Sequence, residues 1–201
     1  RGNERHYHKI VRTAYRKFVM LVIVSTIPTG VIGILFKDTV ELAGTMLIVP
    51  GICLLITSVF LVIADYADEG TKRPREASYV NAGLIGVAQG IATMPGLSRS
   101  GTTITACLLC GFEKKFAVKY SFIMSIPAVL GAVVLELKDV AKAPLQASAV
   151  PACAVATVIS AIVGYLSICI MMRLIQGKKY KIFAVYCAIV GLITVGYGIF
   201  R

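Results

Sequence analysis

Residues 42–64 form a run of 23 residues without a charged side chain. In an α-helix, about 20 apolar residues are enough to cross the ~30 Å hydrocarbon core of a bilayer. Further long apolar runs occupy residues 18–36, 116–137, 147–172 and 182–200. Only 15% of the chain is charged, whereas a soluble domain has about a quarter of its residues charged. We therefore predict an all-α polytopic membrane protein with about five spanning helices, forming a single integral membrane domain over residues 1–201.

The net charge of +11 is explained by the same class of protein. The Lys and Arg residues lie mostly in short blocks between apolar runs, as the positive-inside rule predicts. The chain has no Trp and no basic stripe interleaved with aromatic residues, so the expected partner is the lipid bilayer and not a nucleic acid. The six cysteines lie inside apolar runs, where they act as small hydrophobic residues and not as metal ligands.

The distribution of Lys and Arg predicts which loops share a side of the membrane. The loops at 1–17, 65–78, 113–119 and 173–181 carry six, three, three and four Lys or Arg residues, and those at 37–41 and 138–146 carry one and two. Because cytoplasmic loops are enriched in Lys and Arg, we predict that the four richer loops are cytoplasmic. Residues 79–112 join two of these richer loops, so this segment must leave the cytoplasmic side and return to it.

This returning segment contains two short apolar limbs, residues 79–94 and 102–112, on either side of the sequence PGLSRSG at 95–101. As helices these limbs reach about 24 Å and about 16 Å, so neither comfortably crosses the membrane. We predict a re-entrant helical hairpin over residues 79–112, with its tip near mid-membrane. Irregular backbone at that depth is tolerated only where it is buried in protein or lines a wet cavity.

Arg99 lies in this tip and is the only residue between Glu76 and Glu113 that is charged at neutral pH. An Arg near a helix end can extend its side chain to the interface, but Arg99 is more than ten residues from either flanking loop. Intramembrane charges are functional candidates by default. A purely structural counter-charge is the alternative interpretation.

The residues around Arg99 favour an anion as its ligand. Ser98 and Ser100 bracket it with hydroxyl groups, and Gly96 and Gly101 allow backbone amides to approach a ligand closely. The second limb is expected to begin at about residues 101–103, so its positive helix end would point at the same place. A guanidinium, hydroxyls and a helix N-terminus together favour a phosphate group.

The sequence QGIATMPGLSRSGTT at 89–103 resembles the PGxSRSGxT signature of undecaprenyl-diphosphate phosphatases, the bacitracin-resistance family. The resemblance extends over the whole chain, including IPTGVIGILFKD at 27–38. It implies a multi-pass hydrolase of the bacterial inner membrane. Such an enzyme removes the terminal phosphate from undecaprenyl diphosphate, which recycles the lipid carrier for peptidoglycan synthesis and gives resistance to bacitracin.

The same resemblance implies roles for individual residues of the active-site loop, 95–103. Arg99 would bind the diphosphate and stabilise charge in the transition state. Ser98 and Thr103 would be the hydroxyls that contact phosphate, with either Ser98 or water as the nucleophile. The residues expected to shape the loop or bind substrate are Gly96, Ser100 and Gly101. Gln89 would either bind substrate or tie the two limbs of the hairpin together.

The second motif of that family, an ExxxE followed by Ser-Ser and His, is not present in this sequence. Since the sequence opens with Arg1 and not with Met, we expect a fragment whose N-terminal region holds that motif. Its carboxylates would bind a divalent cation, Mg²⁺ or Ca²⁺, or act as a base. No metal ligand is predicted in the present sequence, and His6 and His8 are expected to be solvated. The isolated chain is therefore predicted to be inactive.

Two alternatives and one pattern remain open. The alternative function is a polyprenyl-phosphate or anion transporter, because broken helices that meet at mid-membrane also serve transport. An assembly subunit with a structural Arg99 leaves the neighbouring Ser and Gly residues unexplained. Residues 25–28 (STIP) and 124–127 (MSIP) are each followed by a Gly and a Lys-Asp pair, which indicates either an internal repeat or a chance match. A further hypothesis is that the protein forms a homodimer.

Overall fold

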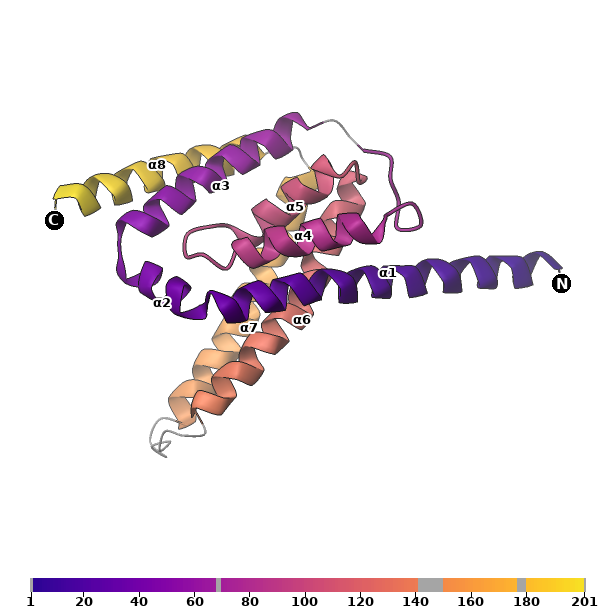
Figure 1. Cartoon of the computed structure of the whole chain (residues 1–201), viewed down its shortest axis with the longest axis horizontal. Helices are drawn as coiled ribbons and strands as arrows, with labels where there is room; N and C mark the ends of the chain where they lie inside the picture. The colour runs from indigo at the N-terminus through magenta and orange to yellow at the C-terminus, as the bar shows by residue number, and fades with distance from the viewer. Residues whose placement is uncertain (1, 68–69, 141–149, 177–179, 201) are drawn as a thin grey trace. The chain divides into compact units, whose positions relative to one another are not determined.

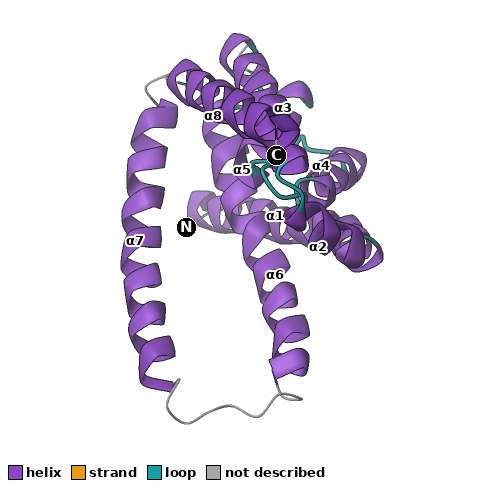
Figure 2. Ribbon diagram, turned by 90° about the vertical axis from the view of Figure 1, so that its left-hand side faces the viewer, coloured by secondary structure: helices purple, strands orange, loops and turns teal. Residues whose placement is uncertain are grey.

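The computed structural model describes residues 2–67, 70–140, 150–176 and 180–200, which form eight helices (Figures 1 and 2). In chain order these are α1 (Gly2–Leu35), α2 (Lys37–Thr45), α3 (Ile48–Tyr66), α4 (Tyr79–Ile91), α5 (Arg99–Leu109), α6 (Lys114–Val140), α7 (Val150–Gln176) and α8 (Tyr180–Phe200). Among the described residues the one departure from helices and loops is an isolated bridge between Lys72 and Phe112. The predicted all-α fold is confirmed.

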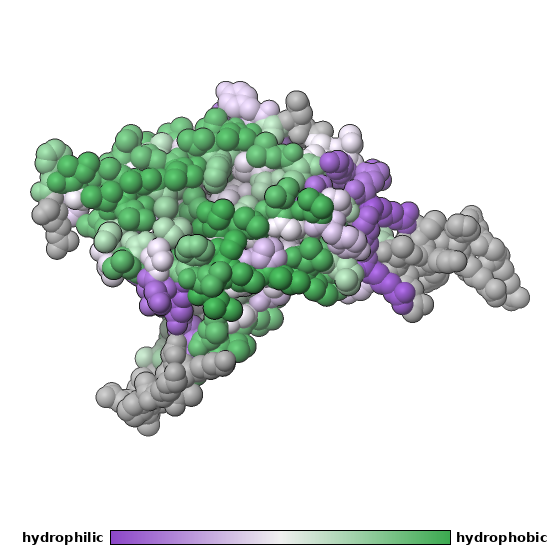
Figure 3. All heavy atoms as spheres, in the orientation of Figure 1, coloured by the Kyte–Doolittle hydropathy of each residue, from purple (hydrophilic) through white to green (hydrophobic). Residues whose placement is uncertain are grey.

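Five helices of the described part are long and apolar enough to span a membrane. The candidate spans are Ala14–Leu35, Ile48–Tyr66, Lys114–Leu137, Pro151–Ile170 and Tyr180–Phe200. Figure 3 shows apolar residues over α3, α8 and α1, with hydrophilic residues gathered around α2 and around the loop between α3 and α4. An apolar surface between two polar rims is what a bilayer requires of a protein that crosses it. The chain is a polytopic membrane protein, as predicted.

The chain divides into two compact units. One unit comprises residues 1–128 and 180–201, and the other comprises residues 129–179. Within the second unit, none of the apolar span of α7 is buried. All the residues predicted to form the functional site belong to the first unit. The prediction of a single integral membrane domain stays a prediction.

In the first unit, helices pack closely through glycine. A Cβ atom at Gly51 of α3 would lie 2.7 Å from the Val195 side chain of α8, and one at Gly86 of α4 would lie 2.1 Å from the Ser25 carbonyl oxygen of α1. The Thr29 hydroxyl of α1 also donates a 2.8 Å hydrogen bond to the Gly86 carbonyl. Small residues and interhelical hydrogen bonds are the usual means of helix association in a membrane. The helix α4 is therefore held tightly against α1, and α8 against α3.

The helices α4 and α5 form the hairpin that the loop charges require, and both of its outer ends lie at the loop between α3 and α4 (Figure 1). The Lys72 amide donates to the Gly111 carbonyl at 3.1 Å, and the Glu113 amide donates to the Lys72 carbonyl at 3.1 Å. Gly111 has a φ of +81°, which suits a residue without a side chain. The segment thus leaves and returns at one place, and the depth of its tip in the bilayer stays a prediction.

The limits of the two limbs differ from those predicted. The first helix ends at Ile91 and not at residue 94, and the second begins at Arg99 and not at residues 101–103. The physical reason for the earlier start is Ser98, which has extended backbone and caps α5 with its side chain. Arg99 is therefore the first residue of a helix, and not part of the preceding loop.

Candidate active site

The connection between α4 and α5, residues 92–98, is a compact turn. The Met94 amide donates to the Ile91 carbonyl at 3.2 Å, and the Leu97 amide donates to the Met94 carbonyl at 3.1 Å. Gly96 follows with a φ of +88°. A Cβ atom at this position would lie 2.3 Å from the Pro50 carbonyl oxygen of α3. Both the dihedral angle and the close approach of the two backbones thus require glycine here.

Ser98 forms the N-terminal cap of α5. Its hydroxyl oxygen accepts a 3.1 Å hydrogen bond from the Gly101 amide. A Cβ atom at Gly101 would lie 3.1 Å from that same hydroxyl oxygen, so glycine leaves room for the cap. The capped amides form the positive end of the α5 dipole, which favours an anion beside it. The assignment of Ser98 as a nucleophile stays a prediction.

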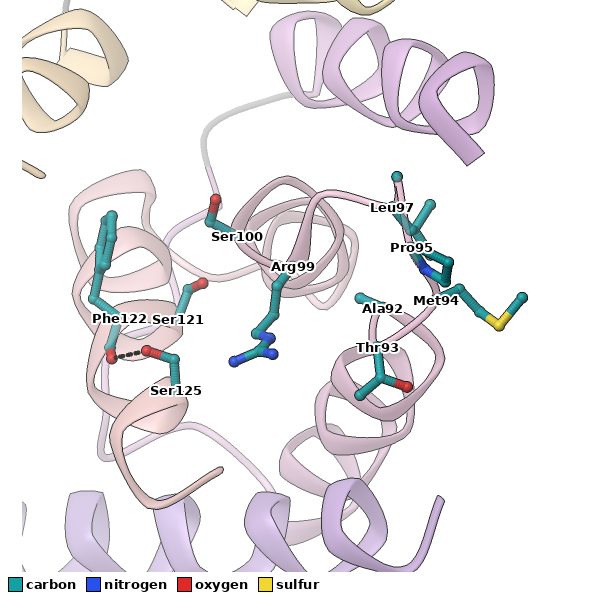
Figure 4. Close-up of a pocket in the computed structure, with 11 residues that line it drawn as sticks. Ala92, Thr93, Met94, Pro95, Leu97, Arg99, Ser100, Ser121, Phe122 and Ser125 are labelled. Carbon is teal, nitrogen blue, oxygen red and sulfur yellow. Dashed lines mark hydrogen bonds between the residues drawn. The ribbon is translucent and has the colours of Figure 1, made fainter. Parts of the chain in front are cut away.

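A cavity of about 480 Å³ lies between this turn and α6. It is lined by Ala92, Thr93, Met94, Pro95, Gly96, Leu97, Arg99, Ser100, Ser121, Phe122 and Ser125. Figure 4 shows the Arg99 guanidinium pointing into the space between Ser125 and Thr93, whereas the Ser100 hydroxyl points away from it. The first residue of α5 therefore places a cation inside the cavity.

Arg99 has no counter-charge within the described residues. The ion pairs found there join other groups, such as Arg73 and Glu113 at 3.7 Å and Lys181 and Asp65 at 3.6 Å. No hydrogen bond of the Arg99 guanidinium is found there either. A planar guanidinium with free donors at the end of a helix can bind a phosphate in a bidentate manner. The cavity is therefore suited to an anion.

The opposite wall of the cavity comes from α6, and the sequence did not point to it. Ser121, Phe122 and Ser125 line the cavity from this helix, with Ser121 and Ser125 four residues apart and so on one helical face. The Ser125 hydroxyl donates to the Phe122 carbonyl at 2.7 Å (Figure 4). The one signal in the sequence was MSIP at 124–127, which includes Ser125.

Two of the predicted site residues lie in the protein core and not at the cavity. Thr103 is 1% exposed, and its hydroxyl donates to the Arg99 carbonyl at 2.8 Å and also contacts the Ser121 hydroxyl. Gln89 is fully buried, and its side-chain nitrogen lies 3.5 Å from the Met124 carbonyl oxygen of α6. In this structure both side chains face α6, so the described contacts favour tying the hairpin in place over touching a ligand.

The predicted residues thus divide by position. Gly96, Arg99 and Ser100 line the cavity, Ser98 and Gly101 build the start of α5, and Thr103 and Gln89 connect the hairpin to α6. Thr57 on α3, which the sequence did not single out, contacts the turn through two hydrogen bonds.

The expected divalent cation does not fit the residues around this cavity. Within the described residues, no three or more His, Cys, Asp or Glu side chains come together to hold a metal ion. The cavity offers a guanidinium and hydroxyl groups, whereas Mg²⁺ and Ca²⁺ take mainly carboxylate and carbonyl oxygens. The side chains of His6 and His8 lie outside the described part of the structure.

The fold and the cavity define a class: an all-helical polytopic membrane protein with an arginine-containing cavity at the tip of a helical hairpin. The chain belongs to the family of bacitracin resistance protein BacA, whose sequence model matches residues 2–193. The resemblance drawn from residues 89–103 is therefore confirmed.

Relatives of the chain are named undecaprenyl-diphosphatase. The relative from Methanosphaera stadtmanae is 40% identical over 194 residues, which cover 96% of this chain and 67% of that protein. Those from Halothermothrix orenii and Methanobrevibacter smithii are 39% and 42% identical, each covering 90% of this chain and 70% and 65% of the relative. The chain thus spans about two thirds of the length of these relatives.

Proposed function

We propose that this protein is a membrane phosphatase that hydrolyses undecaprenyl diphosphate to undecaprenyl phosphate and inorganic phosphate. The observation that carries the proposal is Arg99, a cation that has no counter-charge among the residues that the structure describes and that points into the cavity at the start of α5. Membership of the bacitracin-resistance family and relatives named undecaprenyl-diphosphatase support the same reaction. Its product is the lipid carrier used in peptidoglycan synthesis, and its place is the bacterial plasma membrane.

Arg99 is the central group of the proposed chemistry. Its guanidinium would bind oxygens of the diphosphate, and the N-terminus of α5 would add favourable partial charge. In the direct route a water oxygen attacks the terminal phosphorus, the P–O bond to the bridging oxygen breaks, undecaprenyl phosphate leaves, and the proton lost by the water goes to solvent. In the alternative route the Ser98 hydroxyl attacks first and loses its proton, undecaprenyl phosphate leaves, and water then hydrolyses the phosphoserine to inorganic phosphate and the free Ser98 hydroxyl. Negative charge grows on the bridging oxygen as that bond breaks. A fixed cation aimed at this charge lowers the barrier because it needs no reorganisation during the reaction.

The substrate class agrees with the surface of the protein. A polyprenyl chain is apolar and stays in the bilayer, so a site for its diphosphate must open within reach of the hydrocarbon region. The connection that precedes Arg99 lies against α3, which is a candidate span of 19 residues. A phosphate site between apolar helices suits a substrate that is held in the bilayer, and not one that is dissolved in water.

A divalent cation, Mg²⁺ or Ca²⁺, is a further part of the proposal, as is a homodimer. Cations of this kind accompany most diphosphates, whose charge they neutralise. Because the residues around the cavity do not fit as its ligands, we assign no step to it. Loss of phosphate release in EDTA and its recovery with added Mg²⁺ or Ca²⁺ test the cation. The molecular mass of the purified protein in detergent tests the dimer.

The decisive test compares phosphate release from undecaprenyl diphosphate by purified full-length protein and its Arg99→Ala variant in detergent. We expect a loss of about 100-fold or more in kcat/KM, since a preorganised charge is removed from the transition state. Arg99→Lys keeps the charge but loses the bidentate geometry, so its kcat/KM should lie between those of the unmodified protein and Arg99→Ala. Arg73→Ala is the matched control, because Arg73 pairs with Glu113 away from the cavity.

The outcomes separate the proposal from its alternative. Release that survives Arg99→Ala would show that the reaction occurs elsewhere. A folded protein that binds the lipid through Arg99 but releases no phosphate would contradict hydrolysis, and would favour transport of a polyprenyl phosphate or another anion.

A further inference from the structure

We infer that Thr57, at the centre of α3, is a positioning residue for the phosphate-binding turn: its hydroxyl holds the backbone on both sides of Leu97 and so sets the place of Arg99. The inference rests on the proposed function. Thr57 lies 42 positions before Arg99 in the sequence and does not line the cavity. Any effect it has on the reaction must therefore act through the turn.

The Thr57 hydroxyl makes two hydrogen bonds to the turn. Its oxygen accepts from the Ser98 amide at 2.9 Å, and it donates to the Gly96 carbonyl at 3.2 Å. The side chain is 1% exposed, so water does not compete for either bond. A hydroxyl has one proton to donate and lone pairs to accept. The Thr57 side chain thus provides hydrogen-bond partners for the Ser98 amide and the Gly96 carbonyl, which have none within a helix.

These bonds matter because of where the turn lies. Thr57 is the tenth of the 19 residues of α3, and α3 is a candidate membrane span. In hydrocarbon an unpaired backbone group costs several kcal/mol. The turn can therefore keep its irregular shape beside a candidate span because α3 supplies partners for it. Without Thr57, the Ser98 amide and the Gly96 carbonyl have no other described partner.

The bond to Ser98 fixes the direction of Arg99. Ser98 has a φ of −65° and a ψ of 111°, and the next residue is Arg99, the first of α5. The Ser98 hydroxyl points into the helix to cap Gly101, whereas its amide points outward to Thr57. Ser98 is thus held from both sides. Rotation of its backbone would turn the start of α5 and displace the guanidinium from the cavity.

A second contact between α3 and α5 shows that Thr57 has a particular place in this interface. The Thr105 hydroxyl of α5 donates to the Phe60 carbonyl of α3 at 3.0 Å. This bond lies more than a turn of helix beyond Arg99 and joins two regular helices. Thr57 alone, among the described residues of α3, hydrogen-bonds the turn. Thr105 secures α5 as a whole, and Thr57 secures the residue next to Arg99.

The test uses three single substitutions in the full-length protein. Thr57→Val keeps the shape and removes both hydrogen bonds, Thr57→Ser keeps the hydroxyl, and Ser58→Ala is the matched control. Ser58 is the next residue of α3, and its hydroxyl donates to the Ala184 carbonyl of α8 at 2.8 Å and not to the turn. All three are compared with the unmodified protein and with Arg99→Ala.

We expect Thr57→Val to lower kcat for phosphate release by about 10- to 100-fold, with KM changed by less than about threefold, because misplacement of a catalytic group mainly affects the transition state. Thr57→Ser should restore most of the rate, and Ser58→Ala should leave it within about twofold of the unmodified protein. If Thr57 had only a structural role, Thr57→Val would lower the amount of folded protein but would not lower kcat selectively over KM. In that case Thr57→Ser would also show no particular recovery of the rate.

Hydrogen exchange of the backbone amides gives a second readout that does not depend on catalysis. In Thr57→Val, a peptide covering residues 96–101 should exchange faster than in Thr57→Ser or Ser58→Ala. If the unmodified protein and Arg99→Ala differ in phosphate release but Thr57→Val equals the unmodified protein, the inference is wrong and the proposed function stands. If no form releases phosphate, the proposed function fails. Independently of that result, equal hydrogen exchange of residues 96–101 in Thr57→Val and Ser58→Ala would overturn the inference about Thr57.

Discussion

The helices α3 and α6 both support the hairpin of α4 and α5, but they do so in different ways. From α3 the hairpin receives hydrogen bonds: the Thr57 hydroxyl bonds the backbone of the turn, and the Phe60 carbonyl accepts from the Thr105 hydroxyl further along α5. From α6 it receives mainly side chains, with Ser121 and Ser125 lining the cavity opposite Arg99. The difference indicates that α3 holds the turn beside the guanidinium, whereas α6 both ties the hairpin in place and supplies the hydroxyl residues on the other side of the cavity.

The largest expected effect comes from breaking the close approach of the turn to α3. In Gly96→Ala the Cβ atom would lie 2.3 Å from the Pro50 carbonyl oxygen and would require a φ of +88°. We expect a loss of about 1–3 kcal/mol in the free energy of unfolding from backbone strain, and nearly complete loss of phosphate release. Thermal inactivation in detergent and the release assay measure the two effects.

Gly83→Ala is the control for this substitution. It also adds one methyl group to the hairpin, but a Cβ atom at Gly83 in α4 would have nothing within 4 Å. Alanine favours a helix over glycine by about 1 kcal/mol, so this variant should be as stable as the unmodified protein or more so. Equal behaviour of the two variants would contradict a special role for the contact between Gly96 and α3.

A smaller effect is expected from the side of α6. Ser125→Ala removes a hydroxyl from the cavity wall facing Arg99. We expect KM for the diphosphate substrate to rise by about two- to tenfold, as for the loss of one ordinary hydrogen bond of about 0.5–1.5 kcal/mol, with little change in kcat. Thr194→Ala, which removes a hydroxyl bonded within α8 at 2.7 Å, should change neither constant. A fall in kcat as large as that of Thr57→Val would remove the distinction between the two supporting helices.

The smallest effect is expected at the second contact with α3. Thr105→Val removes the bond to the Phe60 carbonyl and the 2.7 Å bond to the Gly101 carbonyl within α5. We expect a stability loss of about 1 kcal/mol and phosphate release within about threefold of the unmodified protein. If this variant were as impaired in kcat as Thr57→Val, the support from α3 would be general packing and not local positioning of Arg99. The assays are the same as those for Gly96→Ala.

The spans and the hairpin could be predicted because hydropathy and charge are properties of segments. An uncharged run such as residues 42–64 admits few structures in a bilayer, and the loop charges alone required residues 79–112 to return. The start of α5 was placed too late, although Ser98 is a common type of helix cap and could have indicated it.

The supporting residues could not be predicted, since their importance depends on tertiary contacts. Thr57 and Ser125 are ordinary hydroxyl residues within apolar helices, where most such side chains bond to their own helix. For Thr57 the partner is a turn about 40 residues away in the chain, and no local pattern marks such a pair. The same reason explains why the contact of Thr103 with Ser121 could not be predicted.

The internal match of residues 25–28 with residues 124–127 has a partial counterpart in the structure. Both segments lie in helices that contain a proline, Pro28 in α1 and Pro127 in α6. Both also face α4, through the Ser25 carbonyl oxygen near Gly86 and the Met124 carbonyl oxygen near Gln89. The two helices therefore hold the hairpin in a comparable way, and descent from a repeat stays a hypothesis.

The contact between the turn and α3 also bears on the order of synthesis. The helices of the hairpin have 13 and 11 residues, too few for either to enter a bilayer as a stable span. The ribosome completes α3 before it begins α4, so Thr57 is already part of an inserted helix when the turn emerges. The turn then meets a hydrogen-bonding partner that is already in place. Exchanging the order of these two segments in the gene should therefore impair insertion of the hairpin, even though every contact of the finished protein could still form.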